Sequence, residues 1–369
     1  MHYTPLNRDA FVGGRIAEAR KAAGMTQAEL AEKLGFADRQ ILSNLEKGLR
    51  KASPEEIVKT AELTGVDVLQ LTDPYRLTSE KRCFAWRVKK DSIGDNVPYE
   101  EKGWNLIAAY MRFSDALNRL SDPILPQMVV YQDATYQYVR QFAELLVKAW
   151  ELGETPAKKL VEVVREKLNV ELLFVEAPDE VSGASFRNDR FCAMLINRRH
   201  SEGRRNFSIA HELFHILSWT TLHPDHCAPT EVEEVTTKSE KLANVFAAAL
   251  LMPAETVTEK WRCRPKSQPL ASWLEETAAE MSVSADALFW SLVTLRRLKK
   301  DEKPADFHLQ WESGGSEPPL FSPKFAELLH SVLDAGEVSV RKALSLLDLT
   351  YESLDRLMNA HGFTSPHAL

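Results

Sequence analysis

Apolar residues recur at the spacing of amphipathic helices in the middle of this chain. Tyr99 to Leu120 and Tyr136 to Leu152 predict two long helices, which a break from Asp122 to Pro126 separates. Downstream, Val170 to Glu176 and Phe191 to Asn197 are apolar runs with the length of strands. This alternation predicts helical segments followed by a small sheet.

Two more helical patterns follow the predicted strands. Phe207 to Trp219 contains no Gly or Pro, and its apolar residues fall on one helical face. Lys238 to Met252 has the same periodicity, and Pro253 ends it. Ala247, Ala248 and Ala249 would let this second helix lie close against the first, so we expect the two to pack together.

The N-terminal region shows several short helical patterns between Arg15 and Leu71. Two helix starts carry a capping box, Thr26 to Glu29 and Ser53 to Glu56, and the second has Pro at its first helical position. A turn at Leu34-Gly35-Phe36 precedes a short helix from Asp38 to Glu46. This order predicts a helix-turn-helix arrangement.

The C-terminal region predicts a helical hairpin. Pro304 to Pro323 has the composition of a linker, and Val338 to Leu347 and Tyr351 to Ala360 form two short helical patterns. Thr350 is the expected N-cap of the second. The hairpin weakly resembles a second helix-turn-helix; a dimerisation hairpin is the alternative, because the obvious phosphate partners are few: Arg341, Lys342 and Arg356.

Composition limits the class of protein. A chain of 369 residues that is 44% hydrophobic has room for two or three domains and is not mainly disordered. No charged-then-apolar signal follows Met1, and no apolar run reaches the ~18 residues of a membrane span. We therefore expect a cytoplasmic protein without a membrane partner. The cysteines lack CxxC spacing and are expected to be reduced thiols: Cys83, Cys192, Cys227 and Cys263.

The segment His211-Glu212-Leu213-Phe214-His215 carries the clearest chemistry. Histidines four residues apart on a helix project from one face and can share one metal ion. Glu212 stands between them, where its carboxylate can take the proton of an attacking water. This HExxH pattern indicates a Zn²⁺ site and metallopeptidase chemistry, whereas buried structural histidines are the alternative.

Catalytic zinc usually has three protein ligands, so a third must come from elsewhere. A metzincin would have His at the position of Thr221 and Gly at that of Ser218, which excludes that subclass. Glu240 is the predicted third ligand, because it shares a helical face with Asn244 and Leu251 in the following helix. Five residues compete with it, although a solvated loop explains them better: His223, His226, Glu231, Glu233 and Glu234.

Together, Phe207 to His215 and Glu240 to Pro253 resemble the ImmA/IrrE family of zinc peptidases over roughly residues 160 to 300. The resemblance implies that His211, His215 and Glu240 bind zinc and that Glu212 is the general base. The family often has Gly where Phe214 stands, which could narrow the cleft or fill core. Zincins align a substrate along an edge strand, so Met194 to Asn197 is a candidate substrate shelf, with an ordinary buried strand as the alternative.

Gly24 to Ala31 and Leu45 to Gly48 resemble the Xre/Cro family of DNA-binding domains. By that resemblance, base edges would be read in the major groove by the face that contains Arg39, Gln40, Ser43 and Asn44, with Gln27 beside it. Phosphate contacts would come from Lys47, Arg50 and Lys51. Arg15 to Lys51 holds eight basic and five acidic residues, although the whole chain has a net charge of −7. The alternative is a fold used only for protein contact.

These patterns predict an α+β multidomain protein. The expected order is an all-α helix-turn-helix domain (1–75), a helical connector (76–159), a zincin-like α+β peptidase domain (160–303) and a small C-terminal helical unit (320–369). The expected function is a zinc endopeptidase that cleaves a regulatory protein, such as a repressor or antitoxin, and binds an operator in double-stranded DNA, as a homodimer. The alternative is a DNA-binding autoregulator or toxin–antitoxin component whose zinc fold is structural or sensory.

Overall fold

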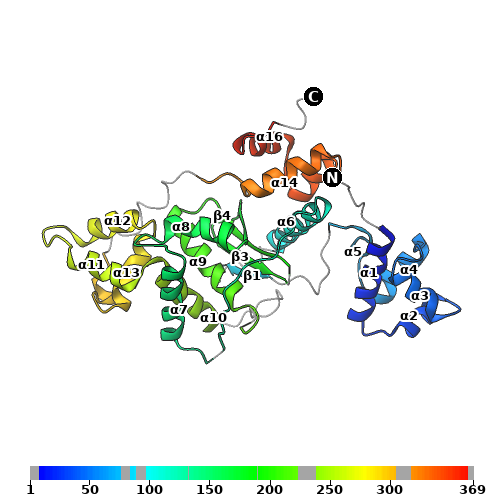
Figure 1. Cartoon of the computed structure of the whole chain (residues 1–369), viewed down its shortest axis with the longest axis horizontal. Coiled ribbons are helices and arrows are strands. Elements are labelled where there is room, and N and C mark those ends of the chain that lie inside the picture. Colours follow the sequence, from blue (N-terminus) through cyan, green and yellow to red (C-terminus); the bar gives the residue numbers. More distant parts are fainter. Residues whose placement is uncertain are drawn as a thin grey trace. The chain divides into compact units, whose positions relative to one another are not determined.

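The computed structural model describes residues 8–75, 84–88, 97–131, 133–188, 190–222, 238–304 and 317–364, and of residues 84–88 and 97–101 it describes the backbone alone. The chain divides into two compact units, and Figure 1 labels their helices and strands. Unit 1 comprises Met1–Arg82, Pro98–Leu120 and Lys324–Leu369, and unit 2 comprises Cys83–Val97 and Ser121–Pro323. Among the described residues, none of the helices is long and apolar enough to cross a membrane.

Unit 1 begins with five helices around one small core. They are α1 (Arg8–Ala22), α2 (Gln27–Leu34), α3 (Arg39–Glu46), α4 (Pro54–Thr64) and α5 (Val68–Thr72). The capping boxes predicted at Thr26 and Ser53 are both present and fix the starts of α2 and α4. A side chain at Gly13 would lie 2.1 Å from the Leu45 carbonyl oxygen, so the close contact between α1 and α3 requires glycine there.

The rest of unit 1 is also helical. It consists of α6 (Val97–Ala116), α14 (Pro323–Asp334), α15 (Val340–Leu347) and α16 (Tyr351–Ala360). Phe325 of α14 stacks on Tyr110 and Phe113 of α6, with ring centroids 5.6 and 6.2 Å apart. Thr350 caps α16 as predicted, because its hydroxyl oxygen accepts a hydrogen bond from the backbone amide of Ser353.

Unit 2 contains a sheet of four strands in the order β1-β3-β4-β2. The strands are β1 (Phe84–Val88), β2 (Glu171–Val175), β3 (Val181–Arg187) and β4 (Cys192–Asn197). β4 pairs parallel with β2 and antiparallel with β3, and β3 pairs antiparallel with β1. The predicted strands correspond to β2 and β4. Almost all residues of these two strands are buried.

Helices surround this sheet in unit 2. They are α7 (Tyr136–Ala149), α8 (Ala157–Glu162), which continues as a π-helical turn η3 (Val163–Lys167), α9 (Glu202–Ser218), α10 (Lys238–Leu251), α11 (Ala254–Arg262), α12 (Leu270–Glu280), α13 (Ala285–Thr294) and the 3₁₀ turn η4 (Lys300–Glu302). α9 packs against β3, β4 and α10, and α10 also packs against α7. α9 is thus the central helix of the unit.

The segment 76–159, which the sequence predicts as one connector, is divided in the structure. α6 lies in unit 1, where Phe113 and Tyr110 face α14. α7 lies in unit 2, where Val139 and Ala143 join the hydrophobic core around α9 and α10. The apolar faces of these two amphipathic helices thus pack against different partners. The periodicity of a helix predicts that it has an apolar face, but not what that face packs against.

Candidate metal centre

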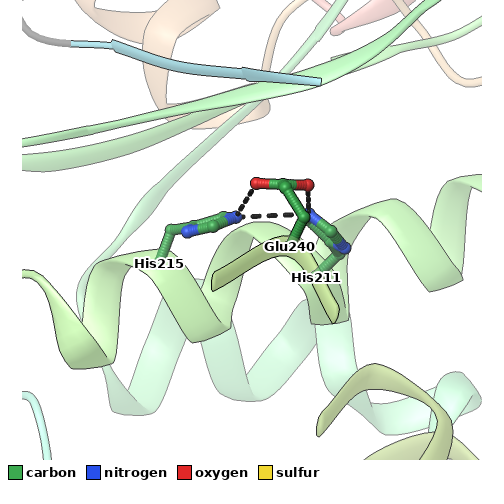
Figure 2. Close-up of side chains that lie close together, drawn as sticks. All are labelled: His211, His215 and Glu240. Atoms are coloured by element: carbon green, nitrogen blue, oxygen red, sulfur yellow. Dashed lines mark hydrogen bonds and ion pairs between the residues drawn. The ribbon is translucent and has the colours of Figure 1, made fainter. Parts of the chain in front are cut away.

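Three side chains from two helices converge in unit 2 (Figure 2). Nε2 of His211 and Nε2 of His215 lie 3.2 Å apart on α9. Glu240 lies at the start of α10. Its Oε2 is 3.1 Å from Nε2 of His211, and its Oε1 is 3.1 Å from Nε2 of His215. The three potential ligand atoms lie within 4.8 Å of one another, so a single ion could contact all of them.

The two histidines are held rigidly because α9 is buried along most of its length. His211 is fully buried, and His215 is 2% exposed. Phe214 is also fully buried and packs against Phe246 of α10, with ring centroids 5.7 Å apart. The bulky residue at this position therefore fills the hydrophobic core between the two helices.

Small residues bring α10 close to α9. Ala243 and Ala247 are fully buried in the core that both helices share, as the alanine-rich pattern of this segment predicts. The Glu240 side chain is 25% exposed, whereas the two imidazoles are closed off from solvent. The cluster therefore meets solvent on the Glu240 side.

The electrostatics of the cluster favour an ionised carboxylate. Burial by itself raises the pKa of Glu240, but hydrogen bonds and charge interactions with His211 and His215 outweigh burial and hold the pKa well below its usual value. A carboxylate and two imidazole nitrogens match the His₂Glu donor set of catalytic zinc sites. The residues present thus fit a zinc ion, which His211, His215 and Glu240 would hold.

Asn244 orients one of the histidines. Its side-chain oxygen lies 3.1 Å from Nδ1 of His211. An amide oxygen can only accept a hydrogen bond, so Nδ1 carries a proton, which makes Nε2 the nitrogen with which a neutral His211 would bind a metal. The helical periodicity places Asn244 on the same face as Glu240, but it gives no indication of this contact.

Glu212 is fully buried beside strand β3. A Cβ atom added to Gly183 of β3 would lie 3.4 Å from Cγ of Glu212 and 3.0 Å from the carbonyl oxygen of Leu195. The Glu212 side chain therefore lies within van der Waals range of position 183, and the tightest contact of an added Cβ would be with the Leu195 carbonyl oxygen. The carboxylate of Glu212, the predicted general base, thus lies between β3 and α9, the helix that carries both histidines.

The predicted substrate shelf at Met194 to Asn197 is wrong. These residues lie in β4, which forms ladders with β2 on one edge and β3 on the other. A strand with both edges paired has no free backbone groups for an added peptide, so the alternative of an ordinary buried strand holds. The competing ligand candidates His223, His226, Glu231, Glu233 and Glu234 lie outside the described residues, as do Cys83 and Cys227.

The other two cysteines, Cys192 and Cys263, form no disulfide. Burial raises the pKa of the Cys192 thiol to about 12, although the nearby charge of Arg187 partly opposes this shift. Cys192 is therefore a neutral thiol within the sheet and a poor metal ligand or nucleophile.

In the helix-turn-helix, Arg39, Gln40, Lys47 and Lys51 are exposed, and Asn44 is partly exposed. Nε2 of Gln40 donates to the Asn44 side chain at 3.0 Å. This places Arg39, Gln40 and Asn44 on one accessible stretch of α3, in agreement with the predicted outer face.

Three of the residues predicted to contact DNA are buried or have a partner within the domain. Ser43 is 7% exposed, contrary to the prediction that it lies outside, because α3 packs against both α1 and α2. The Arg50 guanidinium binds the Glu56 carboxylate at 2.6 Å and lies over the Phe36 ring. Gln27 donates to Glu46 at 2.7 Å. Ser43 is therefore buried, whereas Arg50 and Gln27 are paired with carboxylates of the same domain.

Comparison with known proteins places two domains on the chain. Residues 16–71 match the helix-turn-helix family, and residues 165–288 match the peptidase M78 family, described as the IrrE N-terminal-like domain. A comparison with curated proteins found no match.

Solved structures similar to the chain include PrgX, at 12% identity over 96% of each chain. Another is a bacterial peptide pheromone/receptor complex, at 11% identity over 95% of this chain and 92% of that one. The TM-score is 0.16 in both cases, too low to bear on the fold or the function of this chain. The two family matches, in contrast, coincide with the helices α1–α5 and with the cluster on α9 and α10: the chain carries an N-terminal helix-turn-helix domain and, downstream of it, an IrrE N-terminal-like domain of the peptidase M78 family.

Proposed function

We propose that this protein is a zinc-dependent endopeptidase coupled to a DNA-binding domain. It would cleave a regulatory protein, such as a repressor or an antitoxin, and thereby control transcription in stress response, mobile-element or phage-defence settings. The observation that carries the proposal is the convergence of His211, His215 and Glu240, with the Glu212 carboxylate buried on the same helix. The match to a peptidase family supports it.

Each residue has a role in the proposed reaction. A zinc ion held by His211, His215 and Glu240 would supply a Lewis acid that activates water and polarises the scissile carbonyl. Glu212 takes the proton of the water as the water attacks the carbonyl carbon, and it later delivers a proton to the leaving amine. Asn244 keeps His211 in the tautomer whose Nε2 can bind a metal.

A second function is an autoregulator or toxin–antitoxin component in which zinc is structural or sensory. The observation in its favour is the helix-turn-helix domain, which needs no peptidase activity to bind an operator. However, a purely structural zinc site usually has four protein ligands, whereas the described cluster brings together three and has a carboxylate beside it. The geometry therefore favours the endopeptidase.

The proposal is tested by purifying the wild type, Glu212→Gln and His211→Ala as full chains. Zinc is measured by elemental analysis, and each protein is incubated with proteins encoded beside it. We expect a discrete cut, located by mass spectrometry, from the wild type alone. Glu212→Gln should retain one zinc and lose cleavage by roughly 10²–10⁴-fold, the usual contribution of general acid–base catalysis.

The matched variant His211→Ala should lose both zinc and cleavage. A full zinc equivalent in His211→Ala would contradict the ligand assignment. Zinc binding without cleavage by the wild type of any neighbouring protein would favour the autoregulator.

A further inference from the structure

Strand β1 reaches the sheet from outside the domain that the family match defines. β1 (Phe84–Val88) precedes residues 165–288, whereas β2, β3 and β4 all lie within that range. In the chain, β1 stands between α5 and α6, which both belong to unit 1, although β1 itself belongs to unit 2. The peptidase domain thus has three strands of its own and a fourth that an upstream segment supplies.

β1 pairs with most of one edge of β3, from Phe186 to Val181, with a β-bulge between Arg87 and Val88. The two strands are antiparallel, with Phe84 opposite Phe186, Trp86 opposite Ala184 and Arg87 opposite Gly183. The other edge of β3 is paired with β4. Without β1, the order of the remaining strands would be β3-β4-β2, and β3 would present a free edge.

This edge belongs to the strand nearest the catalytic helix. Gly183 of β3 lies directly beside Glu212, as the short distance from an added Cβ to Cγ of Glu212 shows. Further along the same strand, the Arg187 guanidinium donates to the carbonyl oxygen of Ile216, one turn beyond Glu212 on α9. β3 therefore runs along α9 past the residues of the metal centre, and in Figure 2 the light-blue ribbon of β1 accompanies the strands above the three side chains.

The opposite edge of the sheet is less suited to bind a peptide near the metal centre. β2 forms that edge, and Phe174 of β2 already accepts a hydrogen bond from the amide of Phe321 at 2.7 Å. β2 is also separated from β3 by β4. Among the described strands, the β1 side of β3 is therefore the edge that lies next to Glu212.

An extended peptide binds a sheet by adding a strand to a free edge, where its backbone amides and carbonyls complete the ladder. Each backbone group on the outer edge of β3 can enter one such ladder, so β1 and an added peptide exclude each other. Arg87 of β1 stands opposite Gly183, the residue beside Glu212. The backbone of β1 is therefore where an extended substrate would have to lie to bring a peptide bond near this carboxylate.

We propose that β1 is an internal occupant of the substrate-binding edge, and that an extended polypeptide substrate pairs antiparallel with β3 only after β1 has left. This inference rests on the proposed endopeptidase function. A tethered segment competes at an effective concentration on the order of millimolar, so a separate peptide binds weakly while β1 is in place. The chain is consequently held in a state with its substrate edge closed.

The test uses the full chain with Glu212→Gln, so that peptide binding is measured without cleavage. In this parent, Trp86→Pro with Arg87→Pro removes two consecutive backbone amides from β1, at least one of which faces β3. The matched control, Trp86→Ala with Arg87→Ala, changes the same two side chains and keeps both amides. The probe is a fluorescein-labelled peptide with the sequence of residues 84–90, and its binding is followed by fluorescence anisotropy.

We expect the proline variant to bind the peptide at least ~10-fold more tightly than the parent and the alanine control, because the tethered competitor is removed. Hydrogen exchange gives a second measurement. Within Val181–Arg187, the amides that face β1 should exchange faster in the proline variant and become protected again when the peptide is added, whereas the amides that face β4 should stay protected.

Equal binding of the peptide by all three proteins would overturn the proposal. The unmodified parent provides a check that does not depend on how the proline variant folds: fast exchange of the β3 amides that face β1, with those that face β4 still protected, would show that β1 does not occupy the edge. Tight peptide binding by the proline variant, together with no cleavage when Glu212 is restored, would support the edge assignment and count against the endopeptidase function alone.

Discussion

The helix-turn-helix and the metal centre both bury polar side chains, but they do so in opposite ways. In the first, Arg20 and Glu46 form a 2.6 Å ion pair with side chains 9% and 6% exposed, and Gln27 completes it. In the second, His211, His215 and Glu240 place three potential metal-ligand atoms within 4.8 Å of one another. The first cluster pairs opposite charges with each other, whereas the second has the donor set of a metal site.

This difference separates a stabilising cluster from a functional one. Opposite charges that satisfy each other hold α1, α2 and α3 together and leave the outer face of α3 available. Potential metal ligands gathered in one site, in contrast, gain stability when a metal ion binds them, because metal binding is coupled to folding. A buried polar residue therefore has to be interpreted together with its neighbours, because burial alone does not distinguish the two cases.

The largest effect is expected on breaking the cluster of paired charges. Arg20→Ala would leave the Glu46 carboxylate buried without its guanidinium partner, which typically costs about 3–5 kcal/mol. The free energy of opening of α3, measured by hydrogen exchange in the full chain, should fall by this amount. The exposed pair Arg262–Glu259 supplies the control, since Arg262→Ala should leave the stability of α3 unchanged. A loss below 1 kcal/mol in Arg20→Ala would show that the buried pair is not structural.

The second test concerns the orientation of His211. Asn244→Ala removes the acceptor of the Nδ1 proton and should weaken zinc binding by roughly 10–100-fold, as is usual for such outer partners of a metal ligand. Competition with a chelator measures this change. Asn244→Asp keeps an acceptor oxygen and should retain most of the affinity. Equal loss in both variants would mean that Asn244 acts through packing rather than through its hydrogen bond.

A third test asks whether the exposed face of α3 reads DNA. With an operator obtained by in vitro selection, Arg39→Ala should weaken specific binding by about 1–3 kcal/mol and leave binding to random DNA nearly unchanged. Lys47→Ala should weaken binding to both DNAs alike if Lys47 contacts phosphate. Neither variant should change the zinc content. An Arg39→Ala protein that loses the same affinity for both DNAs would refute base reading.

The smallest effect is expected at Glu56. Burial raises the pKa of this carboxyl, but the Arg50 guanidinium and the Ser53 amide outweigh burial, so the pKa is lower in the folded protein than usual. A lowered folded pKa stabilises the protein above the unfolded value, about 4.3, and this stability is lost as the pH falls through the folded pKa. Glu56→Gln should therefore cost about 1 kcal/mol at pH 7 and almost nothing near pH 2.

Urea denaturation of the full chain at both pH values measures the difference between Glu56→Gln and the wild type. Glu55→Gln, on the neighbouring exposed residue, is the control. A penalty for Glu56→Gln that persists at low pH would show that the side-chain shape, rather than its charge, stabilises the start of α4.

The amino-acid sequence by itself determined the local features. The caps at Thr26, Ser53 and Thr350 mark helix starts, because a cap involves residues only three positions apart. His211 and His215 share a face for the same reason: four residues complete about one turn of a helix. Glu240 was also predictable, since its helical face and the small residues of α10 indicate close packing with α9.

The tertiary structure decided which distant segments meet. Ser43 is buried because α3 packs against two helices, and α6 and α7 join different units because their apolar faces have different partners. β1 lies far from β3 in the sequence, and the free edge of a strand accepts any extended segment with a suitable backbone. Side-chain periodicity predicts which face of a helix or strand is buried. It does not predict which strand pairs with which, so the segment that covers the edge of β3 beside Glu212 is established only on folding.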